Sequence, residues 1–122
     1  MSEPFPVRIP LPPTTNHAYK LALIHGRPAL VKTDALRAWE QGARVITGGW
    51  EYMAHTRLAV AIRLEVPAGN LRRSDIDGYL KALIDVVVGK RADQWVDELH
   101  VTKAPGDGWA TVEVRVLEVV RT

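Results

Sequence analysis

The chain has 122 residues, of which 47% are hydrophobic and 25% are charged, and its formal net charge is only +2. This size and composition predict one globular domain over residues 1–122 and exclude general disorder. The chain has no cysteine, which excludes disulfides, zinc–thiolate sites and iron–sulfur clusters, so any bound metal would be held by oxygen or imidazole.

The first half of the chain predicts an edge strand, a hairpin and a helix. Residues 5–11 alternate apolar residues with proline and arginine, which is typical of an edge strand, and residues 12–16 form a stiff turn. Segments 19–24 and 29–32 flank His25-Gly26-Arg27-Pro28, as in a β-hairpin. A helix then begins after Thr33, a suitable N-cap, and ends at Gly48-Gly49.

The second half predicts three strands and a second helix. Residues 57–66 are apolar at every second position, which indicates a strand with one buried face. A helix over residues 76–88 would bury an apolar stripe consisting of Ile76, Leu80, Leu83, Ile84 and Val87. Strands near 95–103 and over 109–119 follow. Two helices with a mixed or antiparallel sheet predict a small two-layer α+β domain.

Two aspartates at the entry to the second helix are the strongest chemical signal. Asp75 and Asp77 are two residues apart, and Lys81 follows Asp77 by four residues, which places both on one helix face. A third acid, Asp93 or Asp97, lies across the next loop. Convergent carboxylates with a lysine suit Mg²⁺-assisted phosphodiester cleavage. The alternative is that the aspartates only cap the helix and interact with its dipole.

Two segments of the chain carry a specific combination of motifs. Residues 72–85 contain basic residues, Asp-x-Asp, a lysine four residues later and an aspartate four further on, and residues 9–16 read Ile-Pro-Leu-Pro-Pro-Thr-Thr-Asn. The first segment resembles the motif of the RusA-like family of Holliday junction resolvases, and the second is similar to the opening strand and turn of that family. The Gly26-Arg27-Pro28 segment and the strand–turn–strand ending extend the resemblance over nearly the whole chain. The chain departs from the family pattern at Gly78, where asparagine is common.

The resemblance implies a homodimeric endodeoxyribonuclease, dependent on Mg²⁺ with Mn²⁺ as a substitute, that nicks two strands of a four-way DNA junction symmetrically. Asp75 and Asp77 correspond to metal-binding and catalytic acids of the family, and Lys81 to its assisting lysine. The later acid has two alignments. Matching Leu99-His100-Val101 favours Asp93, because that choice leaves the following strand uninterrupted; matching Trp95 to a Trp-x-acid-acid pattern indicates Asp97 or Glu98.

Two basic pairs flank the acidic segment and are the expected DNA contacts. These pairs are Arg72-Arg73 and Lys90-Arg91, although charge alone favours the interpretation that they are solvated surface. Asp85, one turn beyond Lys81, would pair with Lys81 or orient it. Residues 1–13 lack a signal-peptide pattern and no apolar run could span a membrane, so we expect a cytoplasmic protein.

Two other functions remain open. One is a non-catalytic DNA- or protein-binding module of the same fold, in which the acids are helix caps. The other is a metal-dependent phosphatase or nuclease that acts on simpler substrates. A binding module has no need of Asp77 and Lys81 together, and its affinity for nucleic acid should survive when the acids are neutralised.

Overall fold

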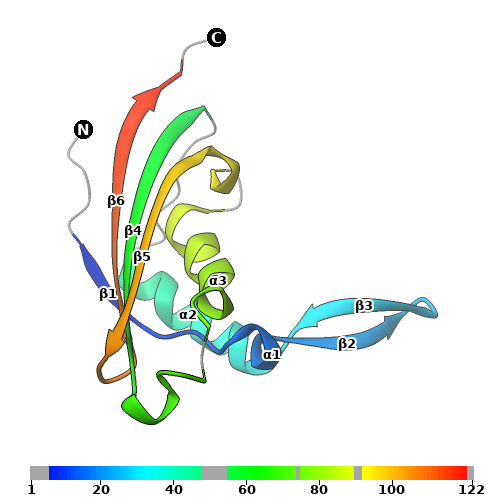
Figure 1. Cartoon of the computed structure of the whole chain (residues 1–122). Coiled ribbons are helices and arrows are strands. Elements are labelled where there is room, and N and C mark those ends of the chain that lie inside the picture. Colours follow the sequence, from blue (N-terminus) through cyan, green and yellow to red (C-terminus); the bar gives the residue numbers. More distant parts are fainter. Residues whose placement is uncertain (1–5, 48–54, 74, 90–91, 121–122) are drawn as a thin grey trace.

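A computed structural model describes residues 6–47, 55–73, 75–89 and 92–120 of the chain (Figure 1). In chain order the elements are β1 (Val7–Pro10), α1 (Thr15–Ala18), β2 (Tyr19–Ile24), β3 (Arg27–Lys32), α2 (Asp34–Thr47), β4 (Thr56–Val66), η1 (Ala68–Asn70), α3 (Asp77–Val88), η2 (Asp93–Trp95), β5 (Val96–Pro105) and β6 (Trp109–Val119). None of the helices within these residues is long and apolar enough to cross a membrane.

Four strands form a mixed sheet in the order β1-β6-β4-β5, with β5 parallel to β4 and the other neighbours antiparallel. The helices α2 and α3 lie on one side of this sheet (Figure 1). The predicted α+β class is confirmed, and the choice between a mixed and an antiparallel sheet is settled as mixed.

The main core lies between the sheet and α3. The alternate residues of β4 from Leu58 to Val66 are at most 2% exposed, as the period of two predicts. From β6, Ala110, Val112 and Val114 join the same cluster, and α3 contributes Leu83, Val86, Val87 and Val88. The other face of β4 carries Arg57, Ala59, Ala61 and Arg63, which are not buried.

The buried face of α3 differs from the predicted stripe. Leu83 and Val87 are fully buried, but Ile76 precedes the helix and is 36% exposed, while Leu80 and Ile84 are only partly buried. Tyr79 is buried in their place, and Ala82 packs with residues of α1 and α2. The stripe is displaced because α3 contacts the sheet on one side and the α1–α2 layer on another, so its buried arc is wider than one stripe.

The connection from the N-terminal turn to α2 contains a helical turn that the sequence pattern did not indicate. Residues Thr15–Ala18 form α1, in which the amides of His17 and Ala18 both donate to the Thr14 carbonyl at 2.8 Å. The Thr33 hydroxyl accepts from the amide of Leu36 at 3.3 Å, which confirms the predicted N-cap. The predicted stop at Gly48-Gly49 lies outside the described residues.

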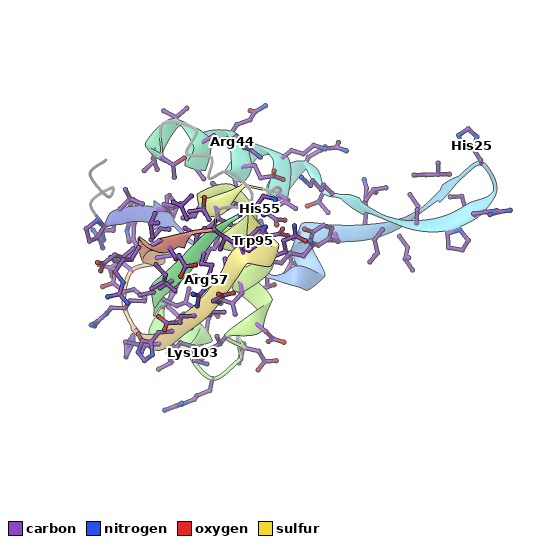
Figure 2. All side chains as sticks on the ribbon, turned by 90° about the horizontal axis from the view of Figure 1, so that it is seen from above. His25, Arg44, His55, Arg57, Trp95 and Lys103 are labelled. Carbon is purple, nitrogen blue, oxygen red and sulfur yellow. The ribbon has the colours of Figure 1, made fainter. Side chains whose placement is uncertain are left out.

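The hairpin β2–β3 is an arm that projects away from the rest of the molecule (Figures 1 and 2). Its loop consists only of His25 (φ 51°) and Gly26 (φ 77°), because β3 begins at Arg27, earlier than the predicted start at residue 29. Positive φ at both loop residues is the pattern of a type I′ turn, whose twist matches that of the flanking strands.

Candidate functional site

The two aspartates lie at the N-terminal end of α3. Asp75 precedes the helix, with its carbonyl accepting from the amide of Gly78 at 3.1 Å, and Asp77 is the first helical residue. Both side chains are exposed. The unpaired amides and dipole of a helix N-terminus favour negative charge at this position.

The N-terminal turn packs against this end of α3. A Cβ atom built on Gly78 would lie 3.8 Å from the Cβ of Thr14, which is ordinary van der Waals contact. The two segments that carry the family resemblance, residues 9–16 and 72–85, are therefore neighbours in space. The same distance shows that a residue with a Cβ atom would fit at position 78. Lack of space therefore does not explain why this chain has glycine where the family commonly has asparagine.

Lys81 lies one helical turn beyond Asp77 and reaches two further groups. Its Nζ is 3.6 Å from Oδ2 of Asp85, which is the expected i,i+4 ion pair. The same Nζ is 6.0 Å from the ring centroid of Tyr19, at the start of β2. The Lys81 side chain is 65% exposed, whereas that of Asp85 is 23% exposed. Asp85 is therefore placed to orient the lysine, while most of the Lys81 side chain stays accessible to solvent.

Tyr19 and Thr14 were not identified as site residues from the sequence. Both are polar or amphipathic residues within or just after the opening turn, but nothing in their spacing connects them to α3. Their proximity to Lys81 and Gly78 is a tertiary contact between segments about 60 residues apart in the chain.

Asp93 lies at the opposite end of α3 from Asp77. It begins η2, and its Oδ1 accepts from the amide of Gln94 at 2.8 Å. A helix of 12 residues such as α3 is about 18 Å long at 1.5 Å per residue. Figure 1 shows the two ends of α3 well apart. Within the described part of the chain, no group of three or more histidine, aspartate or glutamate side chains could hold a metal ion.

Asp97 and Glu98 are engaged in ion pairs across the sheet. Arg57 Nε donates to Asp97 Oδ2 at 2.5 Å, and its NH1 lies 3.4 Å from Glu118 Oε2. The hydrogen bond and charge of Asp97 raise the pKa of the Arg57 guanidinium above its usual value. Glu98 Oε2 lies 3.7 Å from Arg115. These acids connect β5 to β4 and β6.

The strand that follows Asp93 is continuous from Val96 to Pro105, with one irregularity in its pairing with β4. Leu58 pairs with Val96 but Ala59 pairs with Glu98, so Asp97 is an extra residue in the β4–β5 ladder. Asp93 lies before the strand, and this irregularity does not decide between the two alignments.

The donors at the start of α3 suit a hydrated magnesium ion. Asp75 and Asp77 offer exposed oxygen atoms, and neither carboxylate takes part in an ion pair with another described residue. Mg²⁺ in phosphoryl-transfer sites is commonly held by one or two carboxylates, with water and substrate phosphate completing the shell. Asp75 and Asp77 are thus the residues that would hold it.

The expected DNA contacts are described only in part. Arg72 and Arg73 are exposed in the turn that leads to Asp75, whereas Lys90 and Arg91 lie outside the described residues. The indole of Trp95 is tilted against His55 with ring centroids 4.9 Å apart. Of the four expected DNA contacts, Arg72 and Arg73 are the two whose exposure the structure describes.

A shallow hollow of about 320 Å³ lies on the open face of the sheet, over Ala59 and Ala61, with Glu98, His100, Glu113 and Arg115 at its sides. These residues face away from the helices. The hollow is therefore separate from the acidic end of α3.

Neither a scan against protein-family models nor a search of curated proteins found a match for this chain. The resemblance to RusA-like resolvases stays a prediction from the sequence segments compared above.

Proposed function

We propose that this protein is a Mg²⁺-dependent endodeoxyribonuclease that resolves four-way DNA junctions by paired symmetric nicks, in DNA recombination and repair. The observation that carries the proposal is the proximity of Thr14 to Gly78 in the first turn of α3, where an added Cβ would lie 3.8 Å from the Thr14 Cβ. Two sequence segments that resemble one family, residues 9–16 and 72–85, thus lie close together beside two exposed aspartates.

The roles of the residues follow from their positions. Asp75 and Asp77 would hold a magnesium ion, which when bound would supply an activated water and neutralise charge developing on the phosphate. Lys81 stabilises the phosphate oxygens as negative charge accumulates in the transition state. Asp85 holds Lys81 on this face of the helix. Arg72 and Arg73 bind the DNA backbone near the acids.

A cleavage assay with matched variants tests the proposal. The purified protein with Mg²⁺ is incubated with a labelled four-way junction and with linear duplex of the same sequence. The wild type should nick the junction, and Asp75→Asn or Asp77→Asn should abolish nicking while junction binding persists. Asp34→Asn is the control, because Asp34 is also an exposed acid in the first turn of a helix and should leave nicking unchanged. Near-wild-type nicking by Asp75→Asn or Asp77→Asn would refute the proposed centre.

One observation favours the alternative of a non-catalytic binding module. Asp93 is separated from Asp77 by the length of α3, so one chain places only two of the three expected acids together. A binding module would bind junctions equally well without Mg²⁺ and would show no nicking in the wild type.

A further inference from the structure

The arm formed by β2 and β3 carries a row of large apolar side chains on one face. In the β2–β3 register, Leu21 is opposite Leu30 and Leu23 is opposite Pro28, so these four residues share one face, which we call the leucine face. Its three leucines, in chain order, are 74%, 76% and 71% exposed. A contiguous exposed apolar patch of this kind marks a binding surface in a stable protein.

The charge of the arm is of one sign. Lys20 and Arg27 are exposed on the face opposite to the leucine face. Residues 17–33 contain no aspartate or glutamate, although the whole chain has 14 acidic residues. The arm thus extends into solvent, with His25 at its tip (Figure 2), as a ribbon with one apolar and one cationic face. This combination is complementary to nucleic acid, which offers both anionic phosphates and the flat apolar faces of its bases.

The leucine face continues from the tip of the arm to the candidate site. Tyr19 is two residues before Leu21 in β2, so its ring lies on the same side of the ribbon. The ring centroid of Tyr19 is 6.0 Å from Nζ of Lys81. Leu23 is four residues beyond Tyr19, which is about 13 Å along a strand. DNA held at Lys81 would therefore lie within reach of the leucine face.

We propose that the arm is a wedge that inserts the leucine face between bases at the branch point of a DNA junction, with Lys20 and Arg27 against the phosphates. A DNA groove admits a two-stranded ribbon, and proteins that kink DNA insert leucine or proline side chains between base steps. Insertion costs stacking energy, and that cost is lowest where bases are already unstacked. Base stacking is interrupted where the arms of a junction meet, so the wedge favours branched over linear DNA.

The position of the arm favours DNA over a lipid surface. Apolar and cationic side chains together also suit an anionic membrane. The leucine face, however, lies on the side of the ribbon that leads to Lys81, where the DNA cleaved by the proposed centre must already be bound. The inference deepens the proposed function and rests on it for its substrate, and it assigns junction selectivity to the arm.

Fluorescence of 2-aminopurine, an adenine analogue that brightens when it is unstacked, tests the insertion. One junction carries the analogue at the branch point and another carries it within a duplex arm. Both are titrated with protein in Ca²⁺ in place of Mg²⁺, and a denaturing gel reports any nicking. The wild type should raise the fluorescence at the branch point only. The double variant Leu21→Ser, Leu23→Ser should lose this rise and bind the junction at least about 10-fold more weakly, because two leucines no longer leave water, while its affinity for linear duplex changes little.

Matched variants control for the surface and for the charge. Val45→Ser with Val119→Ser replaces two exposed apolar residues of the body and should behave as the wild type. Lys20→Gln with Arg27→Gln keeps the leucines, and so covers the case in which the leucine variant does not fold. It should lower the slope of log affinity against log salt by about 1.8, since two phosphate contacts are lost. Arg63→Gln with Arg115→Gln, on the open face of the sheet, should leave that slope unchanged.

The outcomes separate the wedge from the nuclease. A folded leucine variant with the affinity and fluorescence rise of the wild type overturns the wedge and leaves the nuclease proposal standing, and an unchanged salt slope for Lys20→Gln with Arg27→Gln also overturns it. Insertion by a wild type that nicks no junction with Mg²⁺ supports the wedge and refutes the nuclease. A wild type that leaves the branch-point fluorescence unchanged but binds vesicles of anionic phospholipid through its leucines overturns the wedge and assigns the arm to lipid.

Discussion

Replacing Gly106 with alanine should destabilise the fold, because the β5–β6 turn passes very close to the end of β4. A Cβ on Gly106 would lie 2.4 Å from the Cβ of Glu65 and 3.2 Å from its Cα. Carbon atoms in contact are normally about 3.5–4.0 Å apart. Neither Glu65 atom can rotate away, since both positions are set by the β4 backbone.

The cost follows from what must move. Relief of the clash pushes the turn from β4 and strains two backbone hydrogen bonds, Gly106 N to Val66 O and Gly108 N to Glu65 O, both 2.9 Å. Overpacking costs about 1–3 kcal/mol, and each weakened hydrogen bond adds about 0.5–1.5 kcal/mol. We therefore expect a loss of about 2–6 kcal/mol, which is a large part of the stability of a small domain.

Urea denaturation followed by circular dichroism measures this loss, with Gly42→Ala as the control. Gly42 is exposed in α2 and an added Cβ meets nothing within 4 Å. Alanine there should stabilise by about 0.5–1 kcal/mol, because glycine is unfavourable in a helix. If Gly106→Ala has the same urea midpoint as the wild type while the midpoint of Gly42→Ala is higher, the turn does not pass as close to Glu65 as described.

Three further predictions concern the site and its supports. Lys81→Ala should lower single-turnover cleavage of saturating junction by about 10²–10³-fold with little change in dissociation constant; the reverse pattern would make Lys81 a phosphate anchor. Asp97→Asn should leave nicking unchanged in the junction assay, because Asp97 is engaged by Arg57, whereas a loss equal to that of Asp75→Asn would identify Asp97 as a ligand. Thr33→Ala should lower the free energy of unfolding by about 1 kcal/mol, since the amide of Leu36 loses its cap; an unchanged urea midpoint would contradict this.

The sheet was predictable where one face is covered and the other is open. The alternation in residues 57–66 identified β4 and its buried face, because a strand between helices and open surface must alternate apolar and polar positions. The last strand has the predicted bounds, Trp109–Val119. In α3 the pattern failed, because a helix that contacts two layers buries more than one stripe, and Tyr79 and Ala82 do not stand out in a single period.

The arm was predictable as a hairpin but not as a projection. The apolar segments around His25-Gly26 indicate pairing of two strands, since turn chemistry and strand propensity act locally. Apolar residues on both faces normally indicate a covered ribbon. Nothing in residues 19–32 shows that the body of the same chain leaves Leu21 and Leu30 exposed, because that depends on where α1 directs the ribbon.

The acids show the same division between local and tertiary information. Asp75, Asp77 and Lys81 lie within two turns at the start of α3, so their grouping follows from helical geometry alone. The place of Asp93 depends on the crossover from β4 to β5. Because these strands are parallel, the chain must return along the sheet before β5 begins, and α3 is the segment that returns. Residues that precede and follow α3 therefore lie toward opposite ends of the sheet. The helix predicted over residues 76–88 is long enough to imply this separation if the strands before and after it are parallel. The sequence did not decide between a mixed and an antiparallel sheet, so it could not exclude that Asp93 lies near Asp77.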